Sequence, residues 1–385
     1  MIDKEKQMLF NELQFRDLKK QYEVLKPEID AGIQEVIDSA AFILGKPVAE
    51  LENKFAEYVG RKHCVACGNG TDALVLALRA HDVGLGDAVF VADFTYIASA
   101  SCAELVGATP VFADIDLATF NIDPASLEEA IERTLKEGKL TPKVIIPVDL
   151  FGLPANFEAI QKVADKYGLL VLEDAAQGFG GNINGKVACS FGDISATSFF
   201  PAKPLGCYGD GGAIFTDDDA IAERLRSIRA GGKSPLDKYD NREVGTNSRL
   251  DTLQAAILLP KFRAFVEYEL SDVNKVAGWY TERLKDKVVT PYIPEGYYSS
   301  WAQYTIRLKN KEERDVTQAK LKEAGIPSMI YYPRGMHQQQ VFKYMNLSEE
   351  LYPNAVEATK TVLSLPMHPY LDEETVDEIC SVILK

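Results

Sequence analysis

Lys203 stands between an apolar run and a cluster of glycines, in Ser198-Phe-Phe-Pro-Ala-Lys203-Pro-Leu-Gly-Cys-Tyr-Gly-Asp-Gly-Gly212. A lysine at the end of a buried strand is desolvated, which disfavours the ammonium ion and lowers the pKa of the amine. The neutral amine is a nucleophile that can condense with an aldehyde. If that aldehyde belongs to pyridoxal 5'-phosphate (PLP), the chain must also supply a phosphate cradle and an acid for the pyridine nitrogen.

Two other segments offer those groups. Gly68-Asn-Gly70-Thr71-Asp72 lies between an expected strand and an expected helix, where glycines let the backbone approach an anion and the helix start presents free N–H groups. Leu169-Leu-Val-Leu-Glu-Asp174 places Asp174 at the carboxyl end of a strand, the edge at which ligands of open α/β sheets bind. Taken singly, Asp174 also suits a turn or a helix cap. The order and joint presence of these segments with Ser198 and Lys203 favour a PLP site.

A nicotinamide-dependent dehydrogenase is the competing interpretation. Gly68-x-Gly70-x-x-Ala73 fits a dinucleotide-binding pattern, and Asp93 stands 23 residues after Gly70, where a ribose-binding acid would fall. This interpretation leaves Asp174 and Lys203 without a role, so it ranks second.

The elements that must position these residues alternate between strand and helix. Helical spacing covers Val48–Val59, Asp72–Arg79, Ala98–Leu105 and Phe157–Tyr167. Apolar strand-like runs cover 64–67, 88–92, 110–113, 143–148, 169–173, 194–200 and 212–216. This alternation predicts an α/β domain with a mainly parallel central sheet flanked by helices.

The pattern changes near residue 262 to a helix followed by shorter mixed elements. We therefore expect an N-terminal helical segment plus a large α/β domain over residues 1–261, and a smaller C-terminal α+β domain over residues 262–385.

Composition narrows the class of protein. Lysine plus arginine number 42 and aspartate plus glutamate 57, a net charge of −15 that opposes non-specific attraction to nucleic acid or to an anionic membrane. No apolar run approaches the roughly 20 residues of a membrane helix. The opening Met1-Ile-Asp-Lys-Glu-Lys-Gln lacks the apolar core of a signal peptide. We expect a cytoplasmic protein that binds neither nucleic acid nor membrane.

The six cysteines do not suggest a disulfide scaffold. Cys64-Val-Ala-Cys67 has the spacing of a metal or redox motif, but no second pair follows it. Because the segment is strand-like, the two side chains should point to opposite faces of a sheet. We expect no metal site, and the four histidines form no ligand pattern.

At these residues the chain resembles the DegT-type nucleotide-sugar aminotransferases, which are PLP enzymes of the aspartate aminotransferase fold (PLP fold type I). The resemblance runs from Phe15-Arg-Asp-Leu-Lys-Lys-Gln-Tyr22 to Leu365-Pro-Met-His-Pro-Tyr-Leu371. The other matching motifs are Asn69-Gly-Thr-Asp-Ala-Leu, Glu173-Asp-Ala-Ala-Gln, Ser198 to Gly212, and Gly245-Thr-Asn-Ser-Arg-Leu-Asp-Thr-Leu-Gln-Ala-Ala.

The resemblance implies roles for single residues. Lys203 matches the Schiff-base lysine, which also moves protons, and Asp174 matches the partner of the pyridine nitrogen. The other cofactor contacts that it implies are Gly70, Thr71 and Ser198 at the phosphate, Tyr96 stacked on the ring, Gln177 beside the ring, and Asn247 reaching the phosphate in the neighbouring subunit. Without the resemblance, Tyr96 would be interpreted as a core aromatic. Asn247 implies a homodimer with shared active sites.

The same resemblance implies the substrates. The amino donor is L-glutamate and the acceptor a keto sugar linked to a nucleoside diphosphate, in the synthesis of surface polysaccharides such as O-antigen. The segments at Ser198–Gly212 and Asn247–Pro260 most resemble enzymes that aminate a UDP-linked 3-keto N-acetylhexosaminuronate. A 4-keto or deoxy-sugar nucleotide is the alternative acceptor.

Four residues bear on the choice of sugar. Arg249 matches an arginine that meets a uronate carboxylate from the partner subunit, although a structural ion pair is the other interpretation. Where relatives have His-Tyr-Pro, this chain has Tyr331-Tyr332-Pro333, and a tyrosine does not become cationic. Arg334 is the candidate that compensates; both tyrosines also suit a core position.

Overall fold

The computed structural model describes residues 13–234, 236–237 and 239–385. The opening residues, on which the expectation of no signal peptide rested, lie outside the described part. No helix in the described ranges is long and apolar enough to cross a membrane.

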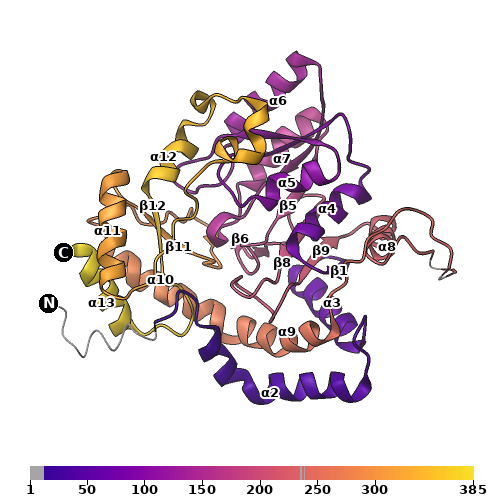
Figure 1. Cartoon of the computed structure of the whole chain (residues 1–385), viewed down its shortest axis with the longest axis horizontal. Helices are drawn as coiled ribbons and strands as arrows, with labels where there is room; N and C mark the ends of the chain where they lie inside the picture. The colour runs from indigo at the N-terminus through magenta and orange to yellow at the C-terminus, as the bar shows by residue number, and fades with distance from the viewer. Residues whose placement is uncertain (1–12, 235, 238) are drawn as a thin grey trace.

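A seven-stranded sheet with the order β1-β9-β8-β5-β4-β2-β3 forms the centre of the molecule (Figure 1). Its strands are β1 (His63–Cys67), β2 (Asp87–Ala92), β3 (Thr109–Ala113), β4 (Thr141–Ile146), β5 (Leu170–Asp174), β8 (Ile194–Ser198) and β9 (Gly212–Thr216). All neighbours pair in parallel except β9, which runs antiparallel to both β1 and β8. The predicted mainly parallel sheet is confirmed.

Helices cover both faces of this sheet (Figure 1). One face carries α4 (Gly70–Ala80), α5 (Ala98–Leu105) and α8 (Asp219–Ile228). The other carries α3 (Lys46–Val59) with α9 (Thr252–Ala264) at one half, and α6 (Pro124–Glu137) with α7 (Phe157–Tyr167) at the other. Because both faces are covered, the strands are largely buried, which is typical of a parallel sheet.

Strand β1 shows the alternation that the sequence predicted. Cys64 packs with Phe55 of α3 on one face, whereas Cys67 packs with the α4 side on the other. All six cysteines are buried and unpaired. Among the described residues, no group of three or more histidine, cysteine or acidic side chains is placed to hold a metal.

A second unit forms from the C-terminal part of the chain. Its core lies between α10 (Leu270–Leu284), α11 (Lys311–Glu323), α13 (Glu373–Leu384) and the two-stranded sheet of β11 (Tyr304–Arg307) and β12 (Val362–Leu365). Helix α9, a π-helical turn at Phe265–Glu269 and α10 follow one another without a break. The predicted division at residue 262 therefore falls inside a continuous helix, and the division into two domains stays a proposal.

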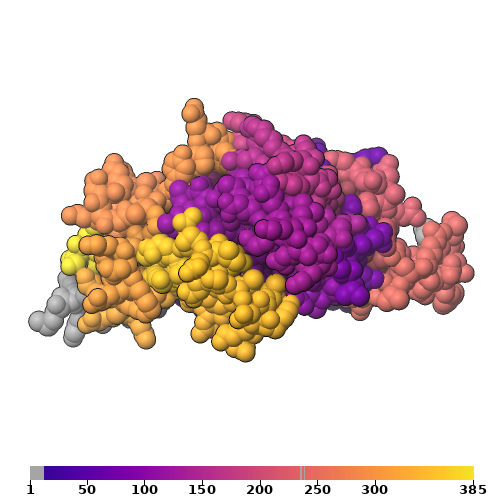
Figure 2. Space-filling model, turned by 90° about the horizontal axis from the view of Figure 1, so that it is seen from above, coloured from indigo at the N-terminus to yellow at the C-terminus, as the bar shows by residue number. Residues whose placement is uncertain are grey.

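Other segments tie the two units together. Helix α2 (Leu18–Ser39) lies along α9 (Figure 1), and β10 (Tyr297–Tyr298) pairs with the hairpin of β6 (Asn182–Ile183) and β7 (Lys186–Val187). The stretch that contains η3 (Met336–Gln338), η4 (Gln340–Met345), η5 (Glu349–Leu351) and α12 (Pro353–Thr361) packs on the large unit, where Phe342 meets Phe112 of β3. Figure 2 shows this yellow stretch against the magenta body.

Candidate active site

A cavity of about 420 Å³ opens at the carboxyl ends of the parallel strands. Nine of the predicted site residues line it: Gly70, Thr71, Tyr96, Asp174, Gln177, Ser198, Lys203, Tyr331 and Tyr332. The lining also includes Asn69, Leu74, Thr95, Ala98, Ser99, Val148, Ala176, Phe200, Ala202, Asp210 and Gln303, which the sequence reasoning did not single out. Most come from loops after β1, β2, β5 and β8, so the sheet edge gathers them.

The floor of the cavity suits a phosphate group. The Asn69 side chain caps α4 by accepting a hydrogen bond from the Asp72 N–H, at 2.8 Å. A Cβ atom on Gly70 would lie 2.6 Å from the Ser198 Cβ, and one on Gly212 would lie 2.5 Å from the Asn69 carbonyl oxygen. Only glycines allow three chain segments to meet this closely, and they bring the start of α4, which includes Thr71, next to the Ser198 hydroxyl group.

Asp174 is a buried carboxylate on the cavity wall. Burial raises its pKa, while a hydrogen bond from Ser99 (Oγ to Oδ2, 2.7 Å), the Ala176 N–H and the charge of Lys203 oppose that rise. Each carboxylate oxygen accepts more than one hydrogen bond, so capacity remains on the cavity side for a protonated ring nitrogen. The site fits the acid that a pyridine ring needs.

Lys203 lies in the turn after β8, where its N–H donates to the Phe200 carbonyl at 2.8 Å. Burial lowers the pKa of its amine; the nearby Asp174 charge raises it and the Arg16 charge lowers it further. The Lys203 Nζ atom lies 6.0 Å from the centre of the Tyr96 ring. Arg16 also contacts this loop, because its Nη2 donates to the carbonyl of Pro204 at 2.9 Å.

Aromatic and amide groups form the walls. Tyr96 is 52% exposed, so one face of its ring is open to the cavity rather than packed in the core. Its ring centre lies 6.5 Å from that of Tyr332. Gln177 is held rigidly, because its Oε1 accepts from the Phe151 N–H at 2.7 Å and its Nε2 donates to the Tyr332 hydroxyl at 3.0 Å. Tyr96, Gln177 and Tyr332 thus line the cavity beside the phosphate floor and give it a partly aromatic wall against which a pyridine ring can stack.

Three predicted residues do not line this cavity. Asn247 and Arg334 are exposed and Arg249 is half-buried. The resemblance placed Asn247 and Arg249 in the neighbouring subunit's site, so a single chain does not test their roles. Their roles, and that of Arg334, remain proposals.

A buried pair missed by the sequence reasoning holds the two walls together. Asp93, directly after β2, accepts from the His337 N–H at 2.8 Å and lies 2.7 Å from the His337 ring nitrogen Nδ1. The Asp93 carbonyl also accepts from the Met336 N–H. With 0% of its surface exposed, Asp93 does not reach a ribose hydroxyl, which counts against the dehydrogenase interpretation. No local pattern signals a contact across 244 residues.

Comparison with known proteins identifies the group to which this site belongs. The sequence model of the DegT/DnrJ/EryC1/StrS aminotransferase family matches residues 23–384. The chain is 46% identical to UDP-2-acetamido-2-deoxy-3-oxo-D-glucuronate aminotransferase from Pseudomonas aeruginosa, over 96% of this chain and 99% of that protein. It is 42% identical to UDP-N-acetyl-3-dehydro-α-D-glucosamine 3-aminotransferase from Acidithiobacillus ferrooxidans, over 95% and 96%.

Solved structures agree. A DegT DnrJ EryC1 StrS aminotransferase from Brucella abortus superposes with a TM-score of 0.93 at 46% identity, covering 97% of this chain and 98% of that one. The PLP form of Spr1654 from Streptococcus pneumoniae superposes with a TM-score of 0.86 at 25% identity, covering 93% and 95%. The predicted fold type and the predicted cofactor are both confirmed.

Proposed function

Since the chain belongs to the DegT/DnrJ/EryC1/StrS aminotransferase family, we propose that it moves an amino group from L-glutamate to the C3 ketone of a UDP-linked N-acetylhexosaminuronate. The observation that carries the proposal is the meeting of Lys203, Asp174 and the glycine floor in one cavity. Both relatives compared above act on 3-keto UDP sugars by name, which supports the carbon and the nucleotide.

Each residue of the cavity has a task in this reaction. Gly70, Thr71 and Ser198 line the cavity where they would bind the cofactor phosphate, and Tyr96 is the residue that would stack on its ring. Asp174 keeps a proton on the ring nitrogen. When bound, PLP supplies an electron sink for the negative charge that develops at the amino-acid α-carbon.

Lys203 performs the proton transfers. Its buried amine would hold the cofactor aldehyde covalently, and once displaced by the amino donor it would be available in the cavity as a base. Because burial lowers the pKa of this amine, it accepts a proton from the donor's α-carbon near neutral pH more readily than an exposed lysine. The same Nζ atom delivers a proton at the sugar carbon in the second half of the reaction.

The proposal also assigns residues that bind the uronate carboxylate. Arg249 of the partner subunit would bind it through a planar guanidinium, the group best suited to a carboxylate. Tyr331 on the cavity wall can donate a hydrogen bond but carries no positive charge, which favours a second candidate, UDP-3-keto-N-acetylglucosamine, whose sugar has no carboxylate. Arg334 is exposed near this wall and is the compensating cation in our proposal.

We propose a homodimer with shared sites. Three consecutive apolar residues, Phe42, Ile43 and Leu44, are each more than two-fifths exposed. They lie beside residues 251–252, just after Arg249. The backbone of Ile43 forms a β-bridge with that of Asp251, and the Thr252 N–H donates to the Phe42 carbonyl. A continuous apolar surface next to residues meant for another site supports a second copy of the chain as its cover. We further propose a cytoplasmic enzyme of surface-glycan synthesis.

A panel of keto-sugar nucleotides tests the function. With L-glutamate as donor, we expect turnover of the UDP-3-keto uronate, slower turnover of its 3-keto counterpart without the C6 carboxylate, and none of 4-keto deoxy sugars. Turnover of a 4-keto sugar alone would refute the choice of substrate. A visible chromophore that borohydride traps on Lys203 tests the cofactor separately, and its absence after PLP is added would refute the PLP assignment.

A further inference from the structure

Ser248 lies between the two residues proposed to act in the neighbouring subunit's site. Asn247 is exposed and Arg249 half-buried, whereas Ser248 is only 1% exposed. In an extended segment, alternate residues face opposite sides, so the inward side chain of Ser248 fixes the outward direction of its neighbours. The Ser248 N–H donates to the Arg229 carbonyl at 2.9 Å, and the backbone of Asn247 forms an antiparallel β-bridge with that of Ala230.

The Ser248 hydroxyl joins this segment to the phosphate floor of its own subunit. Its Oγ donates to Asp72 Oδ2 at 2.6 Å and accepts from the Gly68 N–H at 3.0 Å. Gly68 and Asp72 flank the turn that contains Gly70 and Thr71. One hydroxyl group therefore contacts both sides of the phosphate turn.

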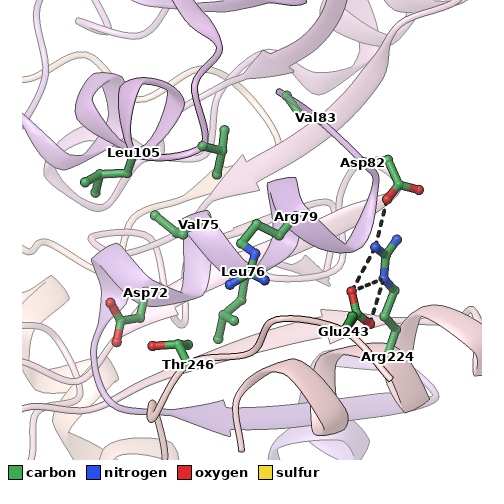
Figure 3. A pocket seen from close by; sticks show the side chains of 11 residues that line it. Asp72, Val75, Leu76, Arg79, Asp82, Val83, Leu105, Arg224, Glu243 and Thr246 are labelled. Atoms are coloured by element: carbon green, nitrogen blue, oxygen red, sulfur yellow. Dashed lines mark hydrogen bonds and ion pairs between the residues drawn. The ribbon is translucent and has the colours of Figure 1, made fainter. Parts of the chain in front are cut away.

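The segment before Ser248 is fastened along the outer flank of α4. The Arg79 side chain donates to the Val244 carbonyl, and Arg224 pairs with Glu243 (Nη2 to Oε2, 3.0 Å) and Asp82 (2.7 Å). Figure 3 shows these groups around a hollow of about 550 Å³, with Asp72 and Thr246 at one end and Arg224 with its acids at the other. Helix α4 therefore supports the segment along its length and meets it again at the phosphate turn.

From these contacts we propose that Ser248 is a positioning residue that aligns the phosphate turn of its own site and, through the same hydroxyl, the Asn247 and Arg249 side chains that serve the other site of the dimer. The inference rests on the proposed function, because it requires shared sites. Without the hydroxyl, the Gly68 N–H and the Asp72 carboxylate lose a partner inside the structure, and the segment is free to shift. The two sites of the dimer are thereby linked through one buried side chain.

Mixed dimers separate the two effects. In a dimer of wild-type and Lys203→Ala/Ser248→Ala subunits, the one working site has a wild-type phosphate turn and takes its Asn247 and Arg249 from the variant subunit. In a dimer of Lys203→Ala and Ser248→Ala subunits, the working site has the variant phosphate turn and receives unaltered partner residues. Two different affinity tags isolate each mixed dimer.

We expect a defect in both arrangements, but of different kinds. The first should raise KM for the sugar nucleotide about tenfold, the size of one lost hydrogen bond to a charged group, and should weaken PLP binding in that site less than the second does, because Asn247 is one of several proposed phosphate contacts. The second should weaken PLP binding, seen as a higher PLP concentration for half-maximal chromophore. Ser248→Thr keeps the hydroxyl and should restore both. Ser227→Ala is the matched control, since it removes a hydroxyl in the last turn of α8 that donates to the Lys233 carbonyl of the same loop and does not contact α4.

Two results would overturn the inference. If the first mixed dimer has a wild-type KM, Ser248 serves its own phosphate turn only. If Ser227→Ala gives the same defects, the effect is a general loosening of the loop.

Should Ser248→Ala fail to fold, Asp72→Ala and Asp72→Asn take its place in the same dimers. The defect is then expected for Asp72→Ala alone, because Asn keeps an oxygen that accepts the Ser248 hydrogen bond. Failure of the proposed function looks different: the parent protein transfers no amino group, or Asn247→Ala placed in the Lys203→Ala subunit leaves the partnered site unaffected.

Discussion

At the scale of the residue, burial favours the neutral forms of two ionisable groups in one cavity. It lowers the pKa of the Lys203 amine, which favours the neutral base. It raises the pKa of Asp174, yet the Ser99 hydroxyl and the Lys203 charge act against this rise and favour the carboxylate. The Lys203 charge thus supports the carboxylate form of Asp174, whereas the Asp174 charge raises the pKa of Lys203, so burial and the Arg16 charge are what favour the neutral amine.

Replacing Asp174 by Asn should lower kcat by about 10- to 150-fold, because a hydrogen bond to a charged group contributes about 1.5–3 kcal/mol. The neutral amide no longer keeps the ring nitrogen protonated. Ser99→Ala is the control: it removes the hydrogen bond to Asp174 Oδ2 and keeps the carboxylate, so its effect should be smaller. Steady-state kinetics with saturating PLP measure both. Equal losses in the two variants would contradict the role of the charge.

The lowered pKa of Lys203 predicts how the protein without cofactor captures PLP. Only the neutral amine reacts, so the capture rate rises with pH and levels off above the pKa of the amine. Because burial lowers that pKa, the midpoint should lie below the ordinary lysine value of about 10.4. Reductive trapping followed by peptide mass analysis measures the rate at Lys203, with the exposed Lys309 as internal standard. A midpoint at or above the ordinary value would refute the shift.

At the scale of the element, the parallel sheet explains how much of the site was visible in the sequence. Lys203, Asp174, Gly70 and Ser198 each stand at the carboxyl end of a strand-like run, and parallel strands end at one edge. The local pattern was therefore enough to predict that they meet. The antiparallel direction of β9 was not predictable in this way, and neither was the packing of residues 331–337 against the cavity. No short-range pattern in the sequence encodes which distant segment packs at an edge of the sheet.

The Asp93–His337 pair fastens that wall to the end of β2. His337→Ala leaves a buried carboxylate without its partner, so the free energy of unfolding should fall by about 1–3 kcal/mol. Displacement of Tyr331 and Tyr332 should raise KM for the sugar nucleotide more than it lowers kcat. His63→Ala is the control, because its partner Asp219 is exposed and such pairs contribute about 0–1 kcal/mol. Denaturant unfolding and kinetics give the two readings; an unchanged KM would show that the pair does not position the wall.

Asp149 and Glu173 form a second buried pair beneath the sheet edge. Burial raises the pKa of both carboxyl groups, and the neighbouring Glu173 charge raises that of Asp149 further. The folded state therefore holds protons that the unfolded chain releases above about pH 4, so stability falls as pH rises from there through the raised pKa values. Asp149→Asn should flatten this slope, by at most about 1.4 kcal/mol per pH unit for each proton. Denaturant unfolding at several pH values measures it, and an unchanged slope would contradict the assignment.

At the scale of the whole molecule, the cavity draws on distant parts of the chain. The N-terminal segment reaches the Lys203 loop through Arg16, and the C-terminal part supplies Tyr331 and Tyr332. Ligand binding at such a junction should stabilise the fold as a whole. The sequence indicated two domains but not this interdependence, because the contacts that create it join residues far apart in the chain.

Removal of PLP should accordingly lower Tm. A ligand at 100 times its Kd contributes about 2.7 kcal/mol, which corresponds to several degrees for a chain of this size. Lys203→Ala cannot anchor PLP covalently, so added PLP should raise its Tm by less than that of the wild type. Scanning calorimetry with and without cofactor measures both differences. Equal shifts in the two proteins would mean that the covalent anchor adds nothing to stability.

The continuous helix from Thr252 to Leu284 has a mechanical consequence. This helix runs from the large unit into the C-terminal unit. Phe265 packs closely on Gly180: a Cβ atom built on Gly180 would lie 2.4 Å from the Phe265 ring. A continuous helix resists rotation of one unit against the other, and the Asp93–His337 pair joins the opposite wall of the cavity to the end of β2. We therefore expect the fit of a bulky sugar nucleotide to depend on the side chains around the rim of the cavity more than on closure of one unit on the other.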